Sequence, residues 1–428
     1  MPNTVEIYDE LNLYSWDFVR LIFDYGANGD GLTYRERIMD DETIIEEHFQ
    51  DGVLMEMNQY DDPYTDVQPW EYIHTRFDYQ GNVEFKMFMY DDGRRIEQNY
   101  SNGVLYSRYQ FDEGTDGNPD GAYDWHFSYT EYDTYTGHAR MHLIEYDNGA
   151  VQETRYWEDG TIESIEHRDS QGFNDDGGIG AHAWNISFTA FNEFGQISDR
   201  YIEFDDFGTT HDRYENGVIY SSESSDGHAN SYAWDRRDAA YDENGQLAHM
   251  YYRFDDGTER TENYYEGVIT DSYAYNPYND PEYGASWHSV TMHYSDGVLF
   301  HRETDNYSGT RTVDQYEAGQ LMRSDSYDDY HGPEGQAWQH QVFLFNSDDE
   351  LEAKGIVWDN GDQEVTFYGP DGTSEHRYWD GDDSNDWQAR TTHSDEFGVV
   401  YIEEYADEDP LPPDYIPYEI FDGGGYYI

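Results

Sequence analysis

Eight tryptophans recur along this chain at intervals of 49 to 59 residues, and each opens a stretch of similar sequence. They are Trp16, Trp70, Trp125, Trp184, Trp234, Trp287, Trp338 and Trp387. A fixed period of this length is typical of repeat architectures, in which each unit buries its apolar face only against its neighbours. We therefore expect a single repeat array over residues 1–428. Its repeats are expected at approximately 16–69, 70–124, 125–183, 184–233, 234–286, 287–337, 338–386 and 387–428, with the first and last as caps.

Glycines divide each repeat into four short runs of strand length. The repeat that begins at Trp70 has them at Gly81, Gly93 and Gly103. Pairs such as Asp92-Gly93 and Asn216-Gly217 are signals for tight hairpins that need a positive φ. A glycine about every ten residues excludes long helices. The sequence therefore predicts an all-β fold of about eight tandem antiparallel meanders, each with four strands in about 50 residues.

The third run of each repeat is strongly polar, as in residues 258–263 and 310–315. Neither face of such a run suits the inside of a thick core, which favours an elongated single-layer or solenoid-like array. An eight-bladed β-propeller is the alternative, because four strands in about 50 residues also describes one blade.

The charge of the chain restricts its partners. Against 23 Lys and Arg stand 93 Asp and Glu, a formal net charge of -70, while Leu, Ile, Val and Met are scarce and the chain contains 44 tyrosines. The high aromatic content favours an ordered polar β-structure over disorder. Self-repulsion on this scale predicts that salt or divalent cations stabilise the fold, as in a marine or halophilic protein. We expect no nucleic-acid partner and no membrane insertion, while self-association stays open.

The chain contains no cysteine, which excludes disulfides, thiol catalysis and Cys-ligated metal sites. Residues 1–23 lack the basic and apolar regions of a cleaved secretion signal. The protein is therefore expected either to stay inside the cell or to leave it by a route that reads no N-terminal signal.

A family resemblance rests on the pattern Tyr241-Asp242-Glu243-Asn244-Gly245, followed by Phe254-Asp255-Asp256-Gly257. This pattern resembles the tyrosine-aspartate repeats of bacterial surface and secreted proteins. It is similar, more narrowly, to acidic repeat regions that accompany RTX-type, type I-secreted proteins of marine alphaproteobacteria. The resemblance implies an extracellular or cell-surface location, with secretion guided by an uncleaved C-terminal segment that would end at Tyr426, Tyr427 and Ile428. The tandem Gly-Gly-x-Gly-x-Asp calcium motif of RTX proteins is not present.

Acidic loops offer oxygen ligands of the kind that Ca²⁺ prefers, and Ca²⁺ is the one cofactor that we expect. The candidate ligands are Asp24, Asn28, Asp30, Asp112, Asp116, Asp120, Asn174, Asp175 and Asp176. The competing interpretation is that these are solvated turn residues, since carboxylates occur throughout the chain. No pair of acids is singled out as a glycosidase pair would be, so we expect no enzyme, with a propeller-type hydrolase as the less favoured alternative.

The repeated tryptophans also have two interpretations: either they join neighbouring repeats, or an open row of them stacks on sugar rings. The sequence leads us to expect a non-enzymatic secreted or surface protein, a structural or adhesive element stabilised by salt or Ca²⁺. The alternative is a module that binds a glycan, a mineral or a cell-surface component through its aromatic and acidic face.

Overall fold

A computed structural model gives the fold as antiparallel strands. It describes residues 3–10, 15–26, 29–61, 68–112, 125–169, 184–227, 232–277, 286–328, 337–369, 371–382, 384–406, 410–411, 415 and 418–421. The chain divides into two compact units, Met1–Gly217 and Val218–Ile428. Among the described residues, no helix has the length and apolar character needed to cross a membrane.

The first unit contains sixteen of the described strands. They are β1 (Asn3–Tyr8), β2 (Trp16–Gly26), β3 (Gly29–Met39), β4 (Ile44–Gln50), β5 (Val53–Tyr60), β6 (Trp70–Phe77), β7 (Val83–Tyr90), β8 (Arg94–Ser101), β9 (Val104–Asp112), β10 (Trp125–Tyr132), β11 (Ala139–Tyr146), β12 (Val151–Tyr156), β13 (Ile162–Arg168), β14 (Trp184–Phe191), β15 (Ile197–Phe204) and β16 (Thr209–Glu215).

The second unit contains the remaining described strands and one short helix. They are β17 (Val218–Ser225), β18 (Trp234–Tyr241), β19 (Leu247–Phe254), β20 (Glu259–Tyr265), β21 (Val268–Tyr275), β22 (Trp287–Ser295), β23 (Val298–Asn306), β24 (Thr310–Glu317), β25 (Gln320–Asp328), β26 (Trp338–Phe345), β27 (Leu351–Trp358), β28 (Gln363–Tyr368), β29 (Ser374–Trp379), β30 (Ala389–Asp395), β31 (Gly398–Tyr405) and α1 (Tyr418–Phe421).

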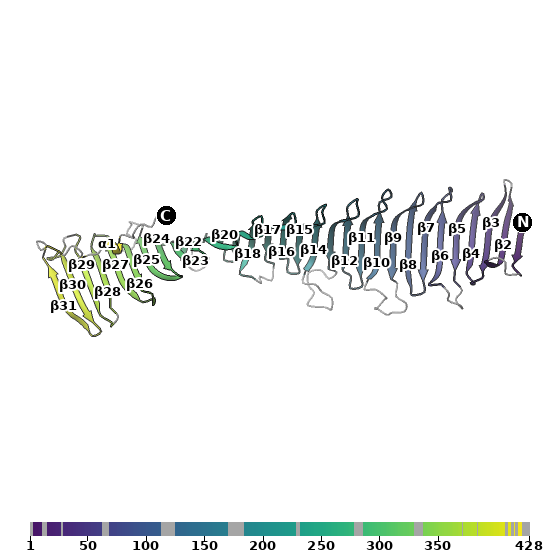
Figure 1. Cartoon of the computed structure of the whole chain (residues 1–428). Coiled ribbons are helices and arrows are strands. Elements are labelled where there is room, and N and C mark those ends of the chain that lie inside the picture. The colour runs from purple at the N-terminus through teal and green to yellow at the C-terminus, as the bar shows by residue number, and fades with distance from the viewer. Residues whose placement is uncertain are drawn as a thin grey trace. The chain divides into compact units, whose positions relative to one another are not determined.

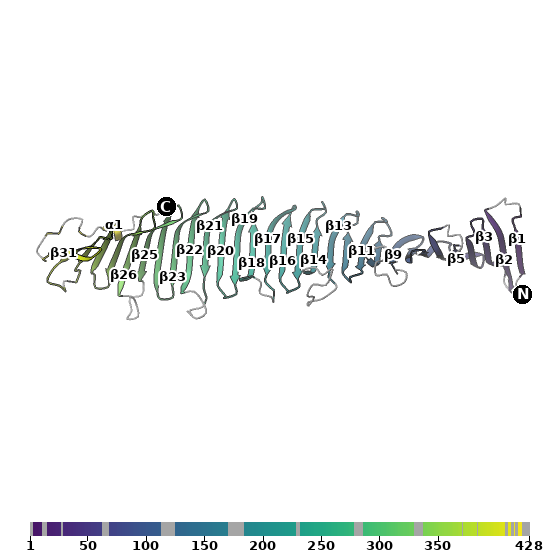
Figure 2. The same cartoon turned by 90° about the horizontal axis from the view of Figure 1, so that it is seen from below.

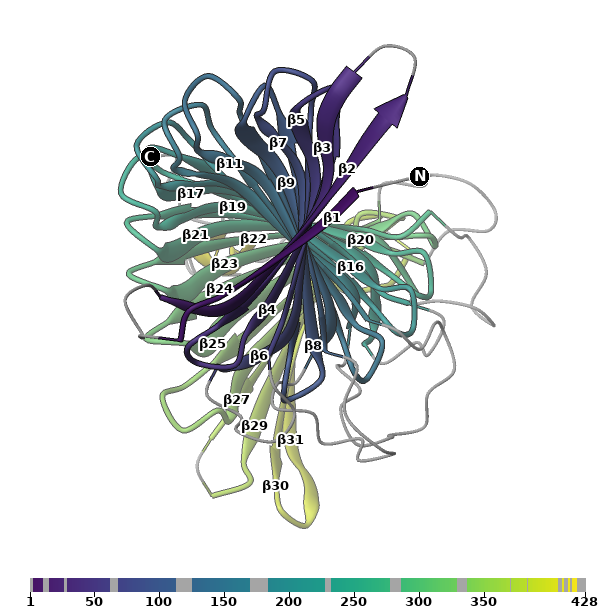
Figure 3. The same ribbon diagram turned by 90° about the vertical axis from the view of Figure 1, so that its right-hand side faces the viewer.

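Within each unit, every described pairing joins strands that follow one another in sequence, and all of these pairings are antiparallel. Figures 1 and 2 show the strands of each unit side by side in chain order. In Figure 3, the strands of the first unit fan out because each is rotated relative to the one before, the twist that L-residues impose on a sheet.

The seams between repeats decide between the array and the propeller. The last strand of one repeat is hydrogen-bonded to the first strand of the next, as β9 is to β10 through the pairs from Phe111↔Phe127 to Ser107↔Glu131. The seams β5–β6, β13–β14, β21–β22 and β25–β26 have the same form. Propeller blades are separate sheets, whereas these repeats share one ladder. The prediction of a single-layer array of antiparallel meanders is therefore confirmed within each unit, and the ring alternative is wrong.

Each repeat tryptophan from Trp16 to Trp338 is the first residue of a strand and is half-buried. A β-bulge follows it directly, as between Trp70 and Tyr72 or between Trp184 and Ile186. The indole lies opposite the residue that ends the next strand, which is aromatic in the pairs Trp70↔Tyr90 and Trp184↔Phe204. Each of these indoles therefore closes one end of a hairpin within its own repeat.

The turns explain the glycine pattern. Several connections consist of two residues that both have a positive φ, as in Asn102 at 51° and Gly103 at 78°. This is the type I′ turn, whose twist matches that of the flanking strands. Other turns begin with an Asp or Asn whose side chain accepts backbone N–H groups, as Asp242 does from Asn244 and Gln246, each at 2.8 Å. Many carboxylates are thus occupied in forming turns.

Fully buried apolar residues are concentrated near the C-terminal end. Val342, Val365 and Ala389 have no exposed surface, and Tyr415 and Ile420 from the following segment cover them. Arg377 donates to the Tyr415 carbonyl at 2.9 Å, and Arg323 donates to the Ile420 carbonyl at 2.9 Å. This segment gives β26, β28 and β30 the second layer that a single sheet lacks.

Candidate metal centre

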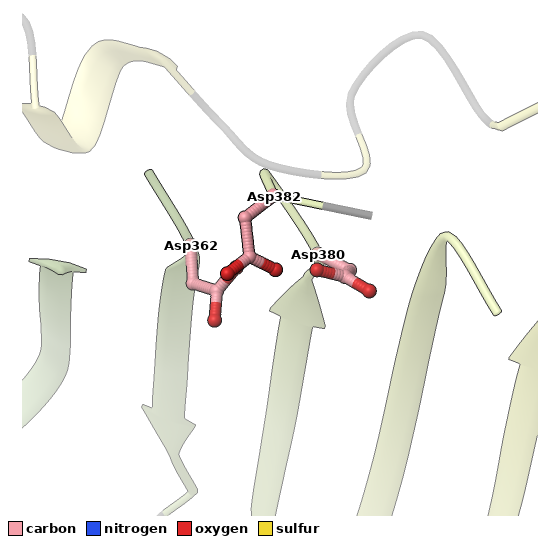
Figure 4. Close-up of side chains that lie close together, drawn as sticks. All are labelled: Asp362, Asp380 and Asp382. Carbon is pink, nitrogen blue, oxygen red and sulfur yellow. The ribbon is translucent and has the colours of Figure 1, made fainter. Parts of the chain in front are cut away.

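Three aspartates meet where two turns of the second unit lie side by side. Asp362 closes the turn between β27 and β28, while Asp380 and Asp382 follow the end of β29. The pairing of β28 with β29, Gln363↔Trp379, brings these turns together. One carboxylate oxygen from each residue lies within 4.8 Å of the others. Figure 4 shows the three side chains at this end of the strands.

The two turns approach each other so closely that one position excludes any side chain. A Cβ on Gly381 would lie 2.1 Å from the carbonyl oxygen and 2.4 Å from the carbonyl carbon of Gly361. Gly361 itself has a φ of +93°, a conformation that L side chains rarely adopt. Two glycines therefore allow the backbones to approach and set the spacing of the three carboxylates.

Backbone and side-chain donors hold the carboxylates. Asp362 accepts from the Gly381 N–H at 2.9 Å and from the Asn360 amide at 2.7 Å, and the Tyr378 hydroxyl donates to it as well. The same Asn360 amide donates to Asp382 at 3.1 Å. One asparagine thus links two of the three acids.

The loop after the cluster supplies further donors. The Ser384 N–H donates to Asp382 at 3.1 Å, and the Asn385 N–H donates to Asp380 at 2.6 Å. Hydrogen bonding with Ser384, and next with Asp380, holds the pKa of Asp382 below its ordinary value. Burial, and then the hydrogen bond to Asp362, raise the pKa of the Tyr378 hydroxyl, so this phenol remains a donor. Asp382 is therefore ionised at neutral pH.

This donor set fits a hard divalent cation. Asp362 and Asp380 are 5% and 3% exposed, and Asp382 is open to solvent. Carboxylate oxygens are the ligands of Ca²⁺ and Mg²⁺, whereas Zn²⁺ sites usually add nitrogen or sulfur ligands. A cation here would have three protein carboxylates and would complete its shell with water.

The calcium ligands expected from sequence lie elsewhere. Asp24 and Asp30 belong to the β2–β3 hairpin, opposite Gly31 and Tyr25, and are described by their backbone only. Asp112 ends β9 as a buried residue opposite Arg94. Asn28, Asp116, Asp120, Asn174, Asp175 and Asp176 lie outside the described residues. Of the described candidates, Asp112 thus lies on β9, whereas Asp24 and Asp30 lie on β2 and β3.

The cluster had a sequence signal, the runs Asp359-Asn360-Gly361-Asp362 and Asp380-Gly381-Asp382. Similar acidic turns occur throughout the chain, so the signal did not stand out. The turns that contain Asp362 and Asp380 differ from the others because they lie next to each other. This adjacency follows from the pairing of β28 with β29 and cannot be read from the sequence.

No family model matches this chain. No curated protein matches it either. Among solved structures, it is similar to the crystal structure of TcdB2-TccC3 without its hypervariable C-terminal region, at 10% identity and a TM-score of 0.18. That match covers 88% of this chain and 22% of the other. A second match, to the WD40 domain of SCAP from fission yeast, has 9% identity and a TM-score of 0.12, covering 87% of this chain and 82% of that one. Both TM-scores are far below those of proteins that share a fold.

Proposed function

We propose that this protein is a non-enzymatic secreted or surface repeat protein that acts as a structural or adhesive element, stabilised by salt or Ca²⁺. The observation that carries the proposal is the hydrogen-bonded seam between repeats. The seam of β5 with β6, from Glu56↔Arg76 to Tyr60↔Tyr72, contains as many residue pairs as the hairpin of β7 with β8 inside a repeat. A load on one repeat therefore passes to the next through backbone hydrogen bonds, which suits a spacer.

The half-buried tryptophans support a structural role over a sugar-binding row. Trp184 stacks on His167 across the β13–β14 seam, with ring centroids 6.1 Å apart, and lies opposite Phe204 within its own hairpin. Indoles that pack in this way offer part of their surface to neighbouring strands rather than a free face to a sugar ring.

The charge of the chain supports stabilisation by cations. A net charge of -70 on a thin sheet produces self-repulsion, which added salt screens over a Debye length of about 8 Å at physiological ionic strength. The cluster of Asp362, Asp380 and Asp382 adds a site at which a bound divalent cation would stabilise the two adjoining turns. Cation binding to the folded state alone would stabilise it by about 2.7 kcal/mol at one hundred times the dissociation constant.

The test compares CaCl₂ with NaCl at equal ionic strength by amide hydrogen exchange of β28 and β29, with a chelator control. We expect Ca²⁺ to slow exchange more than NaCl does in the wild type. Asp382→Asn should abolish that difference. The matched control is Asp242→Asn, because an Asn side chain forms the same kind of turn at Asn192 and Asn346.

The outcomes separate the parts of the proposal. Equal effects of the two salts would show that screening alone acts and that the cluster binds no Ca²⁺.

Antibody labelling and external protease digestion of intact cells test the location. Complete protection of the protein in intact cells would show that the surface assignment is wrong.

A further inference from the structure

Two adjoining hollows lie on one face of the first unit. One, of about 340 Å³, is lined by residues of β10 to β13 and of the turns after β10 and β12. The other, of about 440 Å³, is lined by residues of β12, β13, β14 and β15. They share Arg155, Trp157 and Glu163. Together they form a trough that crosses several strands with Trp157 at its middle, and we call it the Trp157 trough.

Small side chains explain part of the trough. On the face that carries Arg155, the residues directly opposite along the next two strands are Ser164 on β13 and Ala190 on β14. Phe188 and Phe191 border the same hollow. A row of short side chains between long ones leaves a depression on a sheet face, because neighbouring side chains stand roughly perpendicular to the sheet.

An enlarged turn carries the indole. Five other repeats use a two-residue turn at this place, as at Asn102-Gly103. In this repeat, the turn runs through Glu158, Asp159 and Gly160, and the Trp157 N–H donates to the Thr161 carbonyl at 2.8 Å. Trp157 is 39% exposed, and its indole N–H has no hydrogen-bond partner in the described part of the chain. Trp157 is thus more exposed than the eight repeat tryptophans, all of which are half-buried.

The charge around the indole is negative. Two guanidiniums line the trough, those of Arg140 and Arg155, and each is already paired with an acid. Arg140 lies 2.6 Å from Asp133, and Arg155 lies 2.7 Å from Glu153. The remaining acids of the lining are Glu131, Glu158, Glu163 and Glu166, of which Glu166 is paired with Arg168 at 2.5 Å. Carboxylates thus occur in both hollows, on either side of one indole.

We propose that the Trp157 trough binds a linear polyamine, with its methylene chain across the indole and its ammonium groups at the carboxylates of the two hollows. An ammonium over an indole face is attracted by the ring, and carboxylates accept charge-assisted hydrogen bonds. An anionic ligand is repelled by the same carboxylates.

The position of the trough on a sheet face favours a polyamine over a basic peptide as its ligand. The backbone groups of β11 to β14 are engaged with neighbouring strands on both sides, as in the pairs of β12 with β11 and with β13. A peptide lying here would find no sheet edge for its amide groups, and burying unpaired amides costs free energy. A polyamine carries only methylene and ammonium groups.

The test is isothermal titration of the full chain with spermidine at about 0.15 M NaCl, where diffuse attraction is largely screened. We expect one saturable site. Trp157→Ala should weaken it about tenfold, Trp157→Phe should weaken it less, and Glu163→Gln should also weaken it. The matched controls are Tyr265→Ala, which removes a 70% exposed ring elsewhere, and Glu243→Gln, which removes an exposed turn charge; neither should change binding.

Two further probes complete the experiment. Tetraethylene glycol has a similar chain without charge and should not bind. Acetyl-trilysine amide carries as many ammonium groups as spermidine and should bind more weakly. The proposal is overturned if Trp157→Ala, with an unchanged circular dichroism spectrum, binds spermidine like the wild type. It is equally overturned if the wild type shows only unsaturable binding, or if the lysine peptide binds more tightly than spermidine.

Discussion

The substitution Gly381→Ala tests the close approach that sets the spacing of the aspartate cluster. An added Cβ would lie 2.1 Å from the Gly361 carbonyl oxygen, whereas real Cβ contacts are almost never shorter than 3.0 Å. Both partners are backbone, so no flexible side chain can move aside. The two turns must separate by nearly an ångström, which breaks the 2.9 Å hydrogen bond from the Gly381 N–H to Asp362.

The steric overlap and the broken hydrogen bond both lower the local free energy of unfolding. Overpacking of this kind costs about 1 to 3 kcal/mol, and losing a hydrogen bond to a charged group costs about 1.5 to 3 kcal/mol. Because the turns relax partly, we expect a loss near 3 kcal/mol, and thus about 100-fold faster exchange of β28 and β29 amides. Hydrogen exchange with mass spectrometry measures this locally, which suits a repeat array that need not unfold in one step.

Two alanine substitutions serve as controls for Gly381→Ala. At Gly31, a Cβ meets no atom within 4 Å and the backbone has no positive φ, so Gly31→Ala should leave exchange of β3 unchanged. At Gly267, the space is also open but φ is +78°, so Gly267→Ala should cost about 1 kcal/mol from backbone strain alone. If Gly381→Ala accelerates exchange no more than Gly267→Ala does, the close approach is not what holds the two turns.

Two further predictions concern the turns. Ala318 has a φ of +52° in a type I′ turn, so Ala318→Asn should stabilise its hairpin by about 1 kcal/mol and slow amide exchange of β24 and β25; unchanged exchange would argue against the turn geometry. Hydrogen bonds, that from the Asn82 side chain first, lower the pKa of the Asp78 carboxyl in the folded protein. The ionised carboxylate therefore stabilises the fold above the unfolded pKa of about 3.9, and this stabilisation is lost as pH falls through the lower folded pKa. Asp78→Asn should keep the turn, because Asn192 forms the same turn, and should make amide exchange of the turn independent of pH in this range. Asp78→Ala should accelerate amide exchange of the turn at neutral pH as well.

The sequence alone predicted the strands because its signals are local. A glycine with positive φ ends each described type I′ turn, as in Asn102-Gly103. The tryptophan period placed the first strand of seven repeats at the residue where the structure has it, from Trp16 to Trp338. The β-bulge after each of these tryptophans was not predicted, since it depends on the register with the partner strand.

Pairing between strands decided the features that the sequence left open. The repeat period was compatible with both a ladder and a ring, because both need four strands of the same length, and only the hydrogen bonds of strands such as β9 and β10 distinguish them. Asp362 and Asp380 are 18 positions apart, and they meet because β28 pairs with β29. Ser164 and Ala190 likewise form the floor of the Trp157 trough only across the β13–β14 seam. Local backbone preferences are encoded residue by residue, whereas a site made from two strands exists only once their register is fixed.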